Sequence, residues 1–201
     1  MIANIISLLN MLLGFFSIIL SIEGNFGTAG AMILIATVLD LFDGRIARMI
    51  KKKNPYGKHL DTYADLITFC IAPSIMFYGL IWGNAGIYPE LKTIFIFKEK
   101  IIGIFISFLL PICGAYRLAR FSENTQEKGE NYFTGLPTTF AGASLALILS
   151  FVYIPSFLDS ILRANSIEVT QFKLPIIVVF AFFLFYTYLM VSNFKFKRAK
   201  T

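Results

Sequence analysis

Residues 40–65 read DLFDGRIARMIKKKNPYGKHLDTYAD, a charged stretch set between long apolar sequences. A helix that crosses the hydrocarbon core of a bilayer needs about 20 mostly apolar residues. Several segments approach that length without Asp, Glu, Lys or Arg, and the charged stretch separates two of them. These uncharged segments are 1–22, 24–39, 66–89, 101–116, 131–158 and 174–194. The pattern predicts an all-α integral membrane protein with a polar site where two helices meet.

Composition supports the same fold class, because 57% of the 201 residues are hydrophobic, against about 45–50% in soluble domains. The first apolar segment has no basic residue before it and no small-residue cleavage site after it, so we expect a retained helix rather than a signal peptide. We predict one transmembrane domain over 1–201. Its six helices are expected near 3–22, 27–50, 58–82, 99–119, 137–157 and 172–193.

Basic residues indicate how the helices are oriented, because cytoplasmic loops are enriched in Lys and Arg. With six spans, the three most basic segments all lie on one side, which predicts that both termini are cytoplasmic. Anionic lipid headgroups account for the net charge of +6, so no nucleic-acid partner is expected. The basic residues concerned are Lys51, Lys52, Lys53, Lys58, Arg117, Arg120, Lys128, Lys195, Lys197, Arg198 and Lys200.

The aspartates of the charged stretch fall on single helix faces. At about 100° per residue, Asp40 and Asp43 share a face of the second helix with Gly44 and Ala47. Asp61 and Asp65 lie one turn apart on the third helix. The turn signal at 54–57 brings the two helix ends together. Four carboxylates are therefore expected to converge at the cytoplasmic end of this helix pair.

Such a cluster requires compensation. One Asp at the centre of a membrane helix costs about 2.5–3.5 kcal/mol, and neighbouring carboxylates repel one another. Two divalent cations would balance four carboxylates, and an all-oxygen ligand set favours Mg²⁺ or Mn²⁺ over zinc. The alternative is ordinary pairing with Arg45, Arg48 and the lysines at the helix ends. That alternative does not explain why the acids share one face of each helix.

These residues resemble the signature of the CDP-alcohol phosphotransferases, with the pattern Asp40-x2-Asp43-Gly44-x2-Ala47-Arg48-x8-Gly57-x3-Asp61-x3-Asp65. The resemblance implies six transmembrane helices, a homodimer, and two divalent metals held by the four aspartates. It also implies that Asp65 is the general base as well as a ligand. The donor would be a CDP-diacylglycerol-type lipid, whose phosphatidyl group is transferred while CMP leaves. The expected donor-binding residues are Asn4, Ser7, Asp43, Gly44, Ala47, Arg48, Gly57 and Asp61.

Two further stretches resemble the phosphatidylserine synthase branch of this family. They are residues 4–15, and Arg117-Leu-Ala-Arg120-Phe121 followed by residues 132–137. The branch often continues Gly-Leu-Pro-x-Pro, whereas Thr139 stands here at the second proline. This resemblance implies L-serine as the acceptor and phosphatidylserine as the product. The candidate acceptor-binding residues are Arg117, Arg120, Thr134 and Gly135.

Three alternatives remain open from the sequence. Glycerol phosphate or inositol phosphate as acceptor would use the same chemistry and would also attract cationic side chains. In another interpretation, the side chains of Arg117 and Arg120 only extend to the membrane–water interface and determine the orientation of the helices in the membrane. A divalent-cation transporter is the rival of another class, because carboxylates within a membrane also mark ion paths. The fifth and sixth apolar spans contain no acidic residue, which disfavours a transporter.

Overall fold

The protein is described by a computed structural model for residues 2–49, 55–83, 98–124, 132–164, 176–192 and 195–197. Helices dominate these residues, which confirms the predicted helical class. Two three-residue strands are added to it. The elements are α1 (Ile2–Ile22), α2 (Phe26–Met49), α3 (Pro55–Leu66), a π-helical segment η1 (Ile67–Ile71), α4 (Ala72–Trp82), α6 (Lys98–Asn124), β1 (Tyr132–Thr134), α7 (Thr138–Ala164), α8 (Ile176–Val191) and β2 (Lys195–Lys197).

The predicted helix positions agree with these elements, with differences at the ends. The fourth and fifth predicted helices are longer than expected, since α6 continues to Asn124 and α7 to Ala164. The third helix begins at Pro55, inside the predicted turn. Proline is favourable in the first turn of a helix, because that turn's N–H groups have no intrahelical acceptor. Residues 55–57 of the predicted turn therefore belong to α3.

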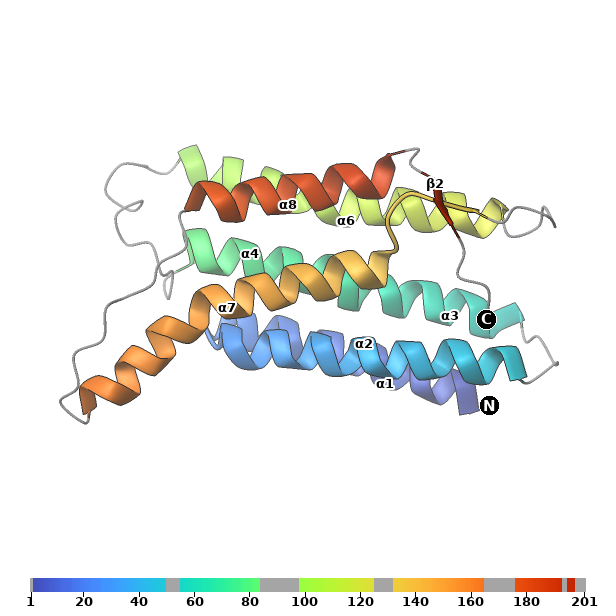
Figure 1. The fold of residues 1–201 in the computed structure, drawn as a ribbon, viewed down its shortest axis with the longest axis horizontal. Helices are drawn as coiled ribbons and strands as arrows, with labels where there is room; N and C mark the ends of the chain where they lie inside the picture. Colours follow the sequence, from blue (N-terminus) through green and yellow to red (C-terminus); the bar gives the residue numbers. More distant parts are fainter. Residues whose placement is uncertain are drawn as a thin grey trace.

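The helices lie roughly side by side along the long axis of the molecule, and α7 crosses them obliquely (Figure 1). The continuous rod α3–η1–α4 occupies the middle, packed by α1, α6 and α7. In the 18 most apolar consecutive residues of its stretch His59–Trp82, 61% are buried, against 28% for Asn4–Ile22 and 33% for Ile101–Ser122. The end of α2 and the beginnings of α1, α3 and α7 lie toward one end of the bundle (Figure 1).

Aromatic packing holds the rod against α8. The Phe77 ring stacks on Phe183 with centroids 3.9 Å apart, and meets Phe180 edge-on at 5.3 Å. Phe77 and Phe183 are fully buried. Aromatic pairs of this kind contribute about 0.5–1.5 kcal/mol each beyond the area they bury. This contact fixes the rod, and hence the residues at its start, relative to the neighbouring helix.

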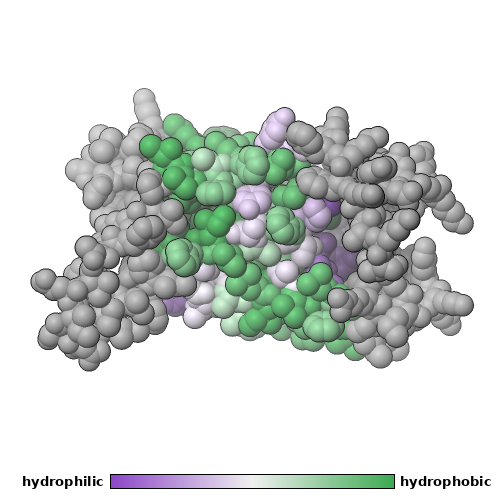
Figure 2. Space-filling model, viewed as in Figure 1, coloured by the Kyte–Doolittle hydropathy of each residue, from purple (hydrophilic) through white to green (hydrophobic). Residues whose placement is uncertain are grey.

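The outer faces of the helices are apolar, which is expected of a protein surrounded by lipid. Phe15, Phe105 and Leu184 are among many large apolar side chains that are exposed. Figure 2 shows hydrophobic residues over much of the described surface in view, with weakly hydrophilic residues across its middle and purple atoms at the end at which α2 finishes and, less extensively, at the opposite end. Among the residues that the structure describes, three helical stretches are long and apolar enough to cross a bilayer, and α2, α7 and α8 contain shorter apolar stretches. The chain is a membrane protein.

The π-helical segment is enclosed by close contacts from three helices. A Cβ at Gly142 of α7 would lie 2.5 Å from the carbonyl oxygen of Phe69. A Cβ added at Gly14 of α1 would likewise meet Thr68, and one added at Gly114 of α6 would meet Sγ of Cys70. Turns of π-helix are rare and frequently occur at functional sites. Here the segment begins two residues after Asp65.

The two strands join distant parts of the chain. β1 pairs antiparallel with β2, with Thr134 opposite Lys195. Gly135 follows β1 with φ +79°, and a Cβ there would lie 2.6 Å from the carbonyl oxygen of Met190. A side chain would be strained in this left-handed conformation. The segment leading into α7 is thereby held against the end of α8.

Candidate active site

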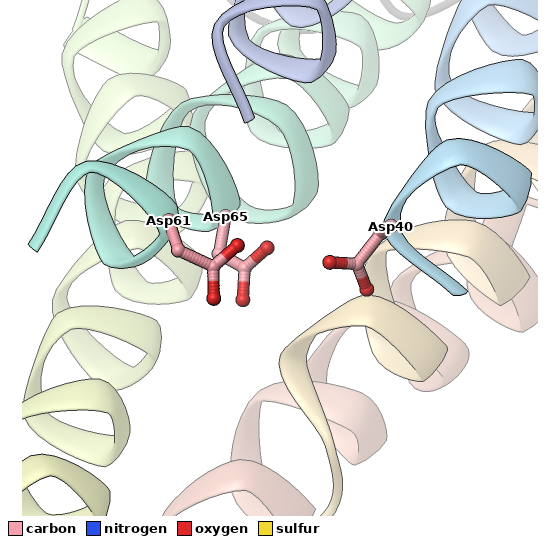
Figure 3. A group of neighbouring side chains, drawn as sticks. All are labelled: Asp40, Asp61 and Asp65. Atoms are coloured by element: carbon pink, nitrogen blue, oxygen red, sulfur yellow. The ribbon is translucent and has the colours of Figure 1, made fainter. Parts of the chain in front are cut away.

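Three of the predicted aspartates meet at one point between α2 and α3. Asp40 lies in the second half of α2, while Asp61 and Asp65 occupy successive turns of α3. One carboxylate oxygen from each lies within 4.8 Å of the others, and all three residues are partly buried. Figure 3 shows the Asp61 and Asp65 side chains next to each other, facing Asp40 across the space between the helices. The predicted convergence is confirmed for these three residues.

The arrangement suits a small divalent cation. Three carboxylates this close repel one another strongly where water is partly excluded. Carboxylate oxygens are the ligands that Mg²⁺ prefers, with bonds of about 2.0–2.1 Å. The carboxylates of Asp40, Asp61 and Asp65 supply three such oxygens within 4.8 Å of one another. The donor set therefore fits the predicted metal.

The beginning of α7 contributes two threonines that the sequence analysis did not assign to the site. Thr139 donates a hydrogen bond from its hydroxyl to Oδ2 of Asp40, at 3.0 Å. Thr138, its buried neighbour, accepts a hydrogen bond from Nη1 of Arg117 at 3.2 Å. The only signal in the sequence was the departure from proline at position 139. One helical turn thus contacts both the acidic group and a buried cation.

Arg117 and Arg120 have different surroundings. Arg117 is only 7% exposed and lies within range of electrostatic interaction with Asp65. Its Nε has no hydrogen-bond partner among the described residues. Arg120 instead donates from Nη2 to the carbonyl oxygen of Ser192, at 3.4 Å, beyond the end of α8. Arg117 is therefore near the acidic group, and Arg120 connects α6 to the residue that follows α8.

Of the predicted donor-binding residues, Asn4 and Gly57 are neighbours at the beginnings of α1 and α3. A Cβ at Gly57 would lie 2.8 Å from Oδ1 of Asn4. Ser7 is buried one turn further along α1. Four further predicted donor-binding residues belong to α2 by their backbone, and one predicted acceptor-binding residue belongs to β1, but the side chains of all five lie outside the described part. These residues are Asp43, Gly44, Ala47, Arg48 and Thr134.

Comparisons with known proteins agree with this geometry. The CDP-alcohol phosphatidyltransferase family matches residues 1–190. CDP-diacylglycerol--serine O-phosphatidyltransferase of Bacillus subtilis is 32% identical, over 82% of this chain and 86% of the relative. Archaetidylserine synthase of Methanothermobacter thermautotrophicus is 31% identical, over 80% of this chain and 61% of the relative. The serine phosphatidyltransferase of Saccharomyces cerevisiae is 28% identical, and the match spans about half of that protein (53%). With an acidic site of the predicted kind and a match along most of its length, this chain is a transferase that belongs to the CDP-alcohol phosphatidyltransferase family.

Proposed function

We propose that this enzyme transfers the phosphatidyl group of a CDP-activated lipid to the hydroxyl of L-serine and releases CMP. The observation that carries the proposal is the meeting of Asp40, Asp61 and Asp65 beside the buried cation Arg117. The names of the bacterial and archaeal relatives support serine as the acceptor. The product is phosphatidylserine, or its ether-linked counterpart where the donor is an archaeal CDP-lipid.

In the proposed reaction, the serine hydroxyl oxygen attacks the phosphorus that carries the diacylglycerol. A bond forms between that oxygen and phosphorus, and the bond from phosphorus to the CMP oxygen breaks. Asp65 accepts the hydroxyl proton, since an alcohol needs a base within hydrogen-bond reach. Two divalent cations, Mg²⁺ or Mn²⁺, would be held by Asp40, Asp43, Asp61 and Asp65. When bound, they would stabilise negative charge on the pyrophosphate and on the leaving CMP.

The donor and acceptor are proposed to approach from different helices. Arg117 offers a cation to the serine carboxylate on the side of Asp65, and an arginine can bind a carboxylate through two parallel hydrogen bonds. Arg120, Thr134 and Gly135 would form the outer part of the same acceptor site. The CDP-lipid would lie along α2 and the beginnings of α1 and α3. Its binding residues would be Asn4, Ser7, Asp43, Gly44, Ala47, Arg48, Gly57 and Asp61.

The protein is further proposed to be a homodimer that crosses the cell membrane six times, with the active site and both termini in the cytoplasm. Single cysteines in a background without Cys70 and Cys113 would test the orientation. A cysteine at Lys52 should react with an impermeant maleimide only after sealed cells are opened. Labelling of intact cells at that position would contradict the orientation. Crosslinking in native membranes would test the dimer.

The acceptor is tested by incubating purified enzyme with CDP-diacylglycerol and one labelled alcohol at a time. We expect labelled lipid and CMP in equal amounts with L-serine, and little product with glycerol 3-phosphate or inositol phosphate. Repeating the assay with a CDP-lipid carrying ether-linked chains would establish the donor. Preferential use of a phosphorylated acceptor would retain the family chemistry and overturn serine.

A further inference from the structure

Asp40 receives a hydrogen bond that neither the signature motif nor the catalytic roles account for. The donor is the hydroxyl of Thr139, at 3.0 Å from Oδ2 and 99 positions away in the sequence. Both residues are partly buried, so the contact is not an exposed surface pairing. Threonines near a helix start commonly bond to their own helix. In this case the hydroxyl donates across to another helix.

The contact orients the Asp40 carboxylate. A hydroxyl that donates to Oδ2 restrains rotation of the carboxylate plane. Because both oxygens lie in that plane, the direction of Oδ1 is restrained as well. Residues that hydrogen-bond to metal ligands in this way keep the ligand in position before the metal binds. Valine has nearly the shape of threonine but cannot donate, and proline at this position would also offer no donor. Threonine at position 139 therefore makes an interaction that proline could not make.

We propose that Thr139 is a positioning residue that holds Asp40 in its metal-binding orientation from the first turn of α7. The inference rests on the proposed function only in that the acidic group binds a divalent cation. It also gives α7 a role in the site. This helix supplies no predicted metal ligand, but through Thr139 it orients the ligand Asp40 of α2. Loss of such a hydrogen bond typically lowers metal affinity or activity about 10–100-fold.

The test measures metal binding directly, without acceptor or turnover. Mn²⁺ is titrated into detergent-purified enzyme while free Mn²⁺ is followed by electron paramagnetic resonance. We expect Thr139→Val to raise the dissociation constant for Mn²⁺ about tenfold or more, and Thr139→Ser to bind nearly as wild type does. Thr37→Val is the matched control, since the Thr37 hydroxyl bonds to the carbonyl of Ile33 within α2, one turn before Asp40. This control should bind Mn²⁺ as wild type does.

The outcomes separate the two proposals. Wild-type affinity in Thr139→Val, or equal losses in the Val and Ser variants, would overturn the role of Thr139 alone. Equal Mn²⁺ binding by wild type and Asp61→Asn would overturn the metal site itself, and with it the proposed chemistry. If Thr139→Val does not elute as a single species in size-exclusion chromatography, Thr139→Ala replaces it with the same expectation. The Mg²⁺ concentration for half-maximal CMP release should rise in parallel, while kcat at saturating Mg²⁺ changes less.

Discussion

At the scale of single residues, Asp65 combines two proposed roles that one substitution can separate. In Asp65→Asn, the amide oxygen can still coordinate weakly but cannot accept a proton. If Asp65 is the general base, CDP-lipid should still bind and the single-turnover rate should fall about 10²–10⁴-fold at every Mg²⁺ concentration. Measuring donor affinity and single-turnover rate across a Mg²⁺ titration tests this. Full recovery of the rate at saturating Mg²⁺ would leave Asp65 as a ligand only.

The two arginines should respond differently to substitution, because Arg117 is buried near Asp65 whereas Arg120 bonds to the residue that follows α8. Arg117→Met should raise the KM for serine about 10–100-fold, since hydrogen bonds to charged groups contribute roughly 1.5–3 kcal/mol, and should leave CDP-lipid affinity nearly unchanged. Arg120→Met removes the bond to Ser192, and should lower the melting temperature with a smaller effect on KM. Steady-state kinetics and thermal melting of both variants decide this. A rise in KM confined to Arg120→Met would reverse the assignment.

The residue-scale predictions succeeded where they depended on one helix and its turn. The spacing of Asp61 and Asp65 fixes their shared face, because helix geometry is local. The meeting with Asp40 required only a short connection between two helices. The bond of Thr139 to Asp40 depends on how α7 packs against α2. The bond of Arg117 to Thr138 depends on how α6 packs against α7. No spacing within one helix contains that information, so these contacts could not be predicted.

At the scale of elements, the π-helical segment should be intolerant of added volume. Gly142→Ala would place a methyl group 2.5 Å from the Phe69 carbonyl oxygen and 2.6 Å from its Cα. Because backbone atoms cannot rotate away, α7 and the segment must separate, and overpacking of this kind costs about 1–3 kcal/mol. We expect a lower melting temperature and reduced kcat, since Asp65 lies in the same helical rod, two residues before the segment. Ser144→Ala, which loses only bonds within α7, should melt as wild type does, and equal effects of the two substitutions would contradict the packing argument.

The elements themselves were predicted from apolar length, and two features were not. The rod from Pro55 to Trp82 was expected as one uniform helix, yet a π-helical segment interrupts it. That change in hydrogen bonding accompanies close approach by three neighbouring helices at Gly14, Gly114 and Gly142. The pairing of β1 with β2 joins residues that are far apart in sequence and offers only three positions on each strand. Patterns this short have no periodicity to detect.

At the scale of the whole molecule, the acidic site brings together carboxylates from α2 and α3 that repel one another unless a cation is bound between them. Asp40 belongs to α2, Asp61 and Asp65 belong to α3, and α7 is tied to Asp40 through Thr139. Without a cation, three carboxylates within 4.8 Å repel one another and oppose this packing. A bound cation reverses the sign of that interaction. Metal binding should therefore stabilise the bundle as well as support catalysis.

This argument predicts a Mg²⁺-dependent melting temperature for the detergent-purified protein. A ligand at 100 times its dissociation constant stabilises the folded state by about 2.7 kcal/mol, which for a chain of 201 residues corresponds to roughly 5–10 °C. Asp61→Asn should lose most of this increase. In chelator, the same variant should melt at or above the wild-type temperature, because one of the repelling charges is gone. An equal rise in melting temperature with Mg²⁺ in wild type and Asp61→Asn would contradict the argument. It would show that Mg²⁺ stabilises the protein–detergent complex at a place other than the acidic site.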